Sequence, residues 1–115
     1  MSGSAGEQEG ARAAAERPIA FDRHELLEIL SIYGRKVAQG EWRDYAIDFG
    51  RDTAVFAVFR RTSEVPLYRI EKTPRLSRRQ GAYAVVAPGG LVLRRGHDLR
   101  QVLKVLLKQP KLQAI

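Results

Sequence analysis

The sequence contains no cysteine, one methionine, one tryptophan and two histidines among its 115 residues. Without cysteine, the chain can form no disulfide, zinc ribbon or iron–sulfur cluster and offers no thiol nucleophile. Its apolar runs are far shorter than the roughly 18 residues that a membrane-spanning helix needs, so we expect no membrane association. The length suits one domain and leaves too few residues for a second core.

Catalytic motifs are also lacking, so we expect no enzyme activity, no cofactor and no metal site. His24 and His97 fall at the starts of two expected helices, and neither has a second histidine at metal-ligand spacing. The chain has no GxxxxGK[ST] phosphate loop and no GxGxxG motif. Its three serines beyond the N-terminal segment do not lie in a nucleophile-elbow context.

Acidic residues are scarce in the second half of the chain. Lysine and arginine total 20 against 13 acidic residues, and the pI is near 10.2. Residues 1–58 contain seven basic and ten acidic residues, whereas residues 59–115 contain thirteen basic and three acidic residues. Arginine outnumbers lysine fifteen to five, and its planar guanidinium suits phosphate recognition. The asymmetry favours a basic face and a polyanionic partner, but a genome rich in arginine codons produces the same bias.

The first 17 residues are small and polar and have no apolar periodicity. They also lack the apolar core of a signal peptide, so export is not expected. Such a segment cannot bury enough surface to offset the entropy lost on ordering. We therefore expect a disordered tail over residues 1–17 and a single domain over residues 18–115.

A helix is expected over residues 23–38. Asp22 is placed to N-cap it, Glu25 completes a capping box, and Gly40 ends it. Apolar residues at i+3 and i+4 spacing give this helix a buried stripe, and alternating residues do the same for the strands. The side chains that we expect to be buried together are Leu26, Leu30, Tyr33, Ile47, Val58, Ile70, Val85 and Leu103.

The hydrophobic period then changes to two, which predicts strands. Pro88, Gly89 and Gly90 predict a hairpin turn, and a final helix is expected from the N-cap Asp98, with Gln101 completing a box, as far as Pro110. We predict an α+β fold of the order α-β-β-β-β-β-α, with a largely antiparallel sheet and both helices on one face. The five expected strands lie at about 45–49, 53–61, 66–72, 82–86 and 91–95.

Basic residues gather in three places in the second half. Arg100, Lys104 and Lys108 share one face of the final helix, a pattern also typical of a solvated face. The segment 72–81 is a basic loop, which can follow a phosphate backbone or serve as an exposed linker. Paired arginines at 60–61 and 94–95 end strands. The candidate nucleic-acid-binding residues are Arg75, Arg78, Arg79, Arg94, Arg95, Arg100, Lys104 and Lys108.

Aromatic residues offer a second mode of contact with single strands, because bases stack on them. Trp42 and Tyr83 are the candidates, since Trp42 precedes the first strand beside Arg43. Four other aromatic residues fall on buried phases of strands and are expected in the core: Phe49, Phe56, Phe59 and Tyr68.

Three strings carry a resemblance to a known family: FDRHELLEILSIYGRKVAQGEWRDYAIDF, AVFAVFRRTSEVPLYRIEKTPR and RRQGAYAVV with LRRGHDL. Over about residues 18–108 the chain resembles a family of small alphaproteobacterial proteins described as a domain of unknown function. The resemblance implies a bacterial, cytoplasmic protein. It implies no activity and no site residues.

The leading hypothesis is a non-catalytic nucleic-acid-binding module, with RNA ahead of DNA. Double-stranded RNA-binding domains have the order helix, three strands, helix, and their basic second helix contacts phosphates; here two further strands intervene. The alternative is a protein-interaction or regulatory subunit that presents a sheet edge or basic face to an acidic protein partner.

Overall fold

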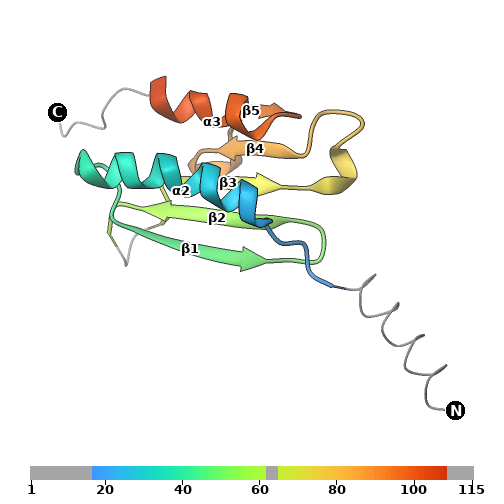
Figure 1. The fold of residues 1–115 in the computed structure, drawn as a ribbon, viewed down its shortest axis with the longest axis horizontal. Helices are drawn as coiled ribbons and strands as arrows, with labels where there is room; N and C mark the ends of the chain where they lie inside the picture. The colour runs from blue at the N-terminus through green and yellow to red at the C-terminus, as the bar shows by residue number, and fades with distance from the viewer. Residues whose placement is uncertain (1–16, 62–64, 109–115) are drawn as a thin grey trace, which may run out of the picture.

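The computed structural model describes residues 17–61 and 65–108 (Figure 1). The predictions for the N-terminal tail and for the chain beyond Lys108 lie outside the described residues. The expected α+β order is confirmed, and no helix in the described part could span a membrane. The elements are α2 (Arg23–Ala38), β1 (Asp44–Phe49), β2 (Ala54–Phe59), β3 (Tyr68–Lys72), β4 (Tyr83–Val86), β5 (Val92–Gly96) and α3 (Leu99–Lys108).

The five strands form one antiparallel sheet in the order β1-β2-β3-β4-β5, so every strand pairs with its neighbours in sequence. Most of the connections between neighbouring strands are too short for the crossover that a parallel pair needs, so these strands pair antiparallel. Both helices lie on one face of the sheet (Figure 1). The strand that is apolar on both faces, β2, lies in the interior, as its sequence predicts.

Local signals fix the ends of α2. The side chain of Asp22 accepts a hydrogen bond from the Glu25 N–H at 2.8 Å, and the Glu25 carboxylate accepts one from the Asp22 N–H at 2.7 Å. The predicted capping box is therefore confirmed. At the other end Gly40 has a φ of 77°, and the Glu41 N–H donates to the Lys36 carbonyl at 2.9 Å. This is a glycine C-terminal motif, which needs a left-handed backbone.

The core lies between the helices and the sheet face that Phe56 and Ile70 occupy. Four of the eight predicted core residues are fully buried: Val58, Ile70, Val85 and Leu103. Leu26, Tyr33 and Ile47 are partly buried against the same cluster.

Three burial predictions are wrong. Phe59 is only half-buried and lies outside the core cluster, because it is on the face of β2 opposite the core. Leu30 is 38% exposed, because the inward stripe of α2 is centred on Ile29 and Ile32. Phe49 is 55% exposed. It points to the helix side of the sheet, since it pairs with the buried Ala54, but β1 is an edge strand and neither helix ribbon lies across it (Figure 1).

Candidate functional site

The connection between β3 and β4 is a basic loop with a fixed course. Its main chain is held by several hydrogen bonds, among them Thr73 N–H to the Ala82 carbonyl at 2.7 Å and Gly81 N–H to the Leu76 carbonyl at 2.9 Å. This order argues against an extended linker. Three side chains of the loop are exposed and have no hydrogen bond or ion pair within the part of the chain that the structure describes: Arg75, Arg78 and Arg79.

A close contact between two glycines joins this loop to β5. Gly81 has a φ of 107°, and a Cβ atom placed on it would lie 2.2 Å from the main-chain carbon of Gly96. Only glycine permits both the left-handed backbone and this approach. Beside the contact, Nη1 of Arg95 donates to the Gly81 carbonyl at 3.3 Å. The loop and the end of β5 therefore form one surface.

The basic side chains of α3 begin at the same end of the molecule. Asp98 caps this helix, because its carboxylate accepts the Arg100 N–H at 3.0 Å. The side chain of Gln101 makes no hydrogen bond within the described chain, so the expected second capping box is not completed. The Arg100 guanidinium binds the Glu28 carboxylate of α2 at 3.1 Å. This ion pair raises the pKa of Arg100 further above its usual value. Lys104 is exposed one turn along.

The topology brings most of the candidate residues together. Tyr83 pairs with Lys72 on one side and with Gly96 on the other, so the end of β3, the start of β4 and the end of β5 lie side by side. We call the surface there the basic end; it comprises Arg75, Arg78, Arg79, Arg94, Arg95 and Arg100. From there α3 runs toward the opposite end of the sheet (Figure 1). Lys104 lies one turn beyond Arg100, and α3 ends at Lys108, whose side chain is outside the described part of the structure.

The second arginine pair of the sequence lies elsewhere. Arg60 and Arg61 follow β2 at the opposite end of the sheet, where they line an open pocket of about 430 Å³ with Arg43 and Trp42. The sequence therefore does not produce one continuous cationic surface from both pairs. Trp42 is only 4% exposed, so the prediction that it is a stacking platform is wrong.

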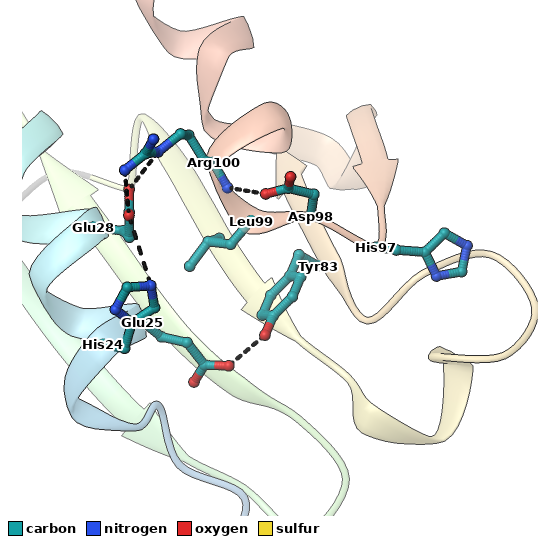
Figure 2. A pocket seen from close by; sticks show the side chains of 8 residues that line it. All are labelled: His24, Glu25, Glu28, Tyr83, His97, Asp98, Leu99 and Arg100. Carbon is teal, nitrogen blue, oxygen red and sulfur yellow. Dashed lines mark hydrogen bonds and ion pairs between the residues drawn. The ribbon is translucent and has the colours of Figure 1, made fainter.

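A second open pocket, of about 420 Å³, lies between the N-terminal ends of the two helices (Figure 2). It contains both signs of charge. His24 lies 3.9 Å from Glu28, whereas His97 is turned away on the far side of Tyr83 (Figure 2). The two histidines therefore do not converge on a common point. The lining residues are His24, Glu25, Glu28, Tyr83, His97, Asp98, Leu99 and Arg100.

A buried polar cluster forms one wall of this pocket. The Glu25 carboxylate accepts hydrogen bonds from the Asp22 main chain, from Lys72 Nζ at 2.8 Å and from the Tyr83 hydroxyl. Lys72 also donates to the Ala20 carbonyl at 2.9 Å. Each donor is thus matched by an acceptor, which buried charge requires. The cluster ties the start of α2 to β3 and β4.

This arrangement keeps the Tyr83 phenol protonated. Burial and the hydrogen bond to Glu25 raise the pKa of Tyr83 well above 10, so the hydroxyl serves as a donor. A phenol held this way is a poor general base. Among the described residues no group of three or more histidine, aspartate or glutamate side chains is placed to hold a metal ion.

Sequence reasoning missed the Glu25, Lys72 and Tyr83 cluster. Glu25 carried a signal as the capping-box residue, but Lys72 and Tyr83 are 47 and 58 residues away in sequence. Tyr83 was a stacking candidate; it is half-buried, and its hydroxyl is engaged with Glu25.

The comparison with curated proteins gave no match, and neither did the comparison with solved structures. A family model does match the chain over residues 19–103, which covers α2, all five strands and the first half of α3. The expected resemblance is confirmed: the chain belongs to the family described as "Protein of unknown function (DUF2794)".

Proposed function

We propose that this protein is a non-catalytic nucleic-acid-binding module that contacts phosphates through the basic end and the outer side of α3. RNA is the preferred partner over DNA, and a cytoplasmic location is part of the proposal. The proposed contacts are Arg75, Arg78, Arg79, Arg94, Arg95, Arg100, Lys104 and Lys108.

One observation carries this proposal: Arg75, Arg78 and Arg79 are exposed on an ordered loop and have no hydrogen bond or ion pair with the described residues. Three neighbouring cations repel each other, and an anionic ligand would relieve that repulsion. Because the loop main chain is already fixed, binding phosphates costs little additional backbone entropy. Guanidinium groups also bind phosphate oxygens in a bidentate manner.

The expected contribution of each remaining residue to phosphate binding depends on whether its side chain already has a partner in the protein. Arg95 donates to the Gly81 carbonyl and Arg100 binds Glu28, so phosphate contact at either competes with an existing interaction. Arg94 and Lys104 are exposed and have no such interaction within the described chain. The loop arginines, Arg94 and Lys104 should therefore contribute more than Arg95 and Arg100.

The preference for RNA rests on the element order and on α3. A basic second helix after an antiparallel sheet also occurs in double-stranded RNA-binding domains, which read shape and phosphates rather than bases. The similarity is one of arrangement alone, since β1 to β5 outnumber the three strands of that fold.

The test is a salt series of binding isotherms, measured by fluorescence anisotropy on duplex RNA, single-stranded RNA and duplex DNA. Arg75, Arg78 and Arg79 are changed together to glutamine. The matched control changes Arg43, Arg60 and Arg61 to glutamine, which removes the same charge from exposed positions at the opposite end. Because each phosphate contact contributes about 0.7–0.9 to the slope of log K against log salt, we expect the loop variant to lower its magnitude by about 2–3.

The control variant should keep the wild-type slope on all three probes. Equal losses in both variants would show that only net charge matters, and no loss in the loop variant would show that the loop does not contact phosphates. Either result contradicts the proposed interface.

A further inference from the structure

Strand β1 has an exposed apolar face. Tyr45, Ile47 and Phe49 pair with the buried residues of β2 and so point to the helix side of the sheet. Tyr45 is nevertheless 46% exposed and Phe49 55% exposed, and Ile47 is only partly buried. Adjacent to them, the exposed side of α2 carries Leu30 and Val37.

Tyr33 shows that this exposed side of α2 lies next to β1. Its ring lies 5.0 Å from the ring of Tyr45, in edge-to-face contact. Leu30 and Val37 are three and four residues from Tyr33 and share its side of the helix. An apolar strip therefore runs from α2 over the edge of the sheet.

The main chain of β1 also has free hydrogen-bonding groups. Gly50 N–H donates to the Thr53 carbonyl at 2.9 Å, in the position next to the pair Phe49–Ala54. Because hydrogen-bonded and non-hydrogen-bonded pairs alternate in an antiparallel ladder, the main-chain groups of Tyr45, Ile47 and Phe49 point away from β2. No strand of the described chain pairs with that edge.

The two edges of the sheet differ in how they are protected. At β5 the pairing register shifts between Val85 and Val86, and Arg94 and Arg95 occupy the strand. A bulge and charged side chains are the usual devices that prevent edge-to-edge association. The strand DYAIDF of β1 carries two aspartates but no lysine, arginine or proline, and its pairing with β2 has no bulge within the strand.

We propose that β1 is a self-association edge, where it pairs antiparallel with β1 of a second copy of this chain, Ile47 opposite Ile47 about a two-fold axis. In this register Tyr45 lies opposite Phe49 of the second copy on the helix side. Six main-chain hydrogen bonds form, since all three outward-pointing residues of each copy find partners. Aromatic cross-strand pairs of this kind stabilise antiparallel sheets.

Charge selects this register over its two neighbours. Residues directly opposite each other must face the same side of the sheet, so the nearest alternatives place Ala46 opposite Ala46 or Asp48 opposite Asp48. The first sets Asp44 opposite Asp48 twice and the second sets Asp48 opposite itself, and like charges in direct opposition are destabilising. With Ile47 at the axis, Asp48 lies opposite Ala46. The second copy is therefore complementary to β1 in one register.

The area involved indicates a weak dimer. The exposed parts of Tyr45, Phe49, Leu30 and Val37 amount to roughly 300 Å² of apolar surface per copy. Two copies supply about half of the roughly 1,200 Å² at the lower limit of stable interfaces, and the main chain adds to this. We expect a dissociation constant between about 10 µM and 1 mM. This inference does not depend on the proposed nucleic-acid contacts.

Single-cysteine variants test the register directly, because the chain contains no cysteine of its own. Across a hydrogen-bonded pair the Cα atoms lie about 5.5 Å apart, within the range for a disulfide. Ile47→Cys should therefore give a covalent dimer on mild oxidation. Ala46→Cys is the control, since in this register its two copies lie more than about 7 Å apart and cannot be bridged. Cross-linking of Ala46→Cys with equal or greater yield would overturn the register.

Sedimentation of the full-length wild type tests the association itself, without a change to the partly buried Ile47. The average mass should rise with concentration between about 10 µM and 1 mM. Phe49→Lys should abolish the rise, whereas Leu91→Lys, at an exposed leucine in the turn before β5, should leave it unchanged. A wild type that is monomeric over the whole range, or a Phe49→Lys variant that still associates, would overturn the proposal.

Discussion

The buried Glu25 carboxylate should be a main determinant of stability. Its side chain is 8% exposed and that of Lys72 is 17% exposed, and the two charged groups lie 2.8 Å apart. Glu25→Gln keeps an acceptor for the Asp22 N–H, because glutamine also serves in capping boxes. It removes the charge that compensates Lys72 and replaces the oxygen that faces the Tyr83 hydroxyl.

The size of the effect follows from these contacts. Breaking a buried pair costs about 3–5 kcal/mol, and losing a hydrogen bond to a charged group costs about 1.5–3 kcal/mol. Lys72 keeps its hydrogen bond to the Ala20 carbonyl and some contact with water, which lowers the cost. We expect Glu25→Gln to lower the free energy of unfolding by about 2–3 kcal/mol, or the Tm by about 10–20 °C.

The assay is urea unfolding followed by circular dichroism. Glu71→Gln is the matched control, since Glu71 binds Arg69 in a half-exposed pair on the other sheet face and should cost less than about 1 kcal/mol. Adding Lys72→Met to Glu25→Gln should restore stability, because it removes the uncompensated charge. A loss below about 0.5 kcal/mol for Glu25→Gln, or additive losses in the double variant, would refute this reasoning.

Three further predictions concern the effects of two glycines and one tyrosine on stability. Gly34→Ala, at an open position inside α2, should stabilise the protein by about 0.5–1 kcal/mol in the same unfolding assay. Gly81→Ala should cost about 3 kcal/mol or more, because its Cβ would overlap the main chain of Gly96; Gly89→Ala, with a similar positive φ but open surroundings, should cost much less. Since the folded state holds the Tyr83 phenol proton more tightly than the unfolded state, stability should fall as the pH rises above about 10, and Tyr83→Phe should flatten that fall in thermal melts at successive pH values.

Local signals in the sequence were enough to predict where α2 begins and ends. Asp22, Glu25 and Gly40 act through contacts within a few residues, so their roles can be read without knowledge of the tertiary structure. The direction in which the helix faces was not predictable in this way. Apolar residues at positions 26, 27, 29, 30, 32 and 33 occupy more than half of its circumference, and several stripes fit them.

The buried side of α2 includes two charged residues beside Ile29 and Ile32. Glu25 and Lys36 both lie inward, which a hydrophobic pattern argues against. Lys72 and Glu41 compensate them, at 2.8 and 3.1 Å. Partners that are remote in sequence, such as Lys72, leave no local signal. The same limit applies to Phe49. The alternation of apolar and polar residues predicts which face of the sheet Phe49 is on, but its exposure depends on how far the helices extend across the strands.

For the candidate site, the sequence identified the basic residues but could not place them relative to each other. The antiparallel pairing separates Arg60 and Arg61 from the loop arginines, because β2 and β3 run in opposite directions and finish at opposite ends of the sheet. The contact of Gly81 with Gly96, which joins the loop to β5, depends on that same topology.

The most direct test of the proposed function is filter binding of the wild-type protein to total cellular RNA and DNA across a salt series. If the basic end contacts phosphates as proposed, RNA should be retained at about 150 mM salt. Log K should also fall linearly with log salt, with a slope of about −2 or steeper. Absence of measurable RNA or DNA binding at that salt concentration would contradict nucleic-acid binding and direct the search to an acidic protein partner.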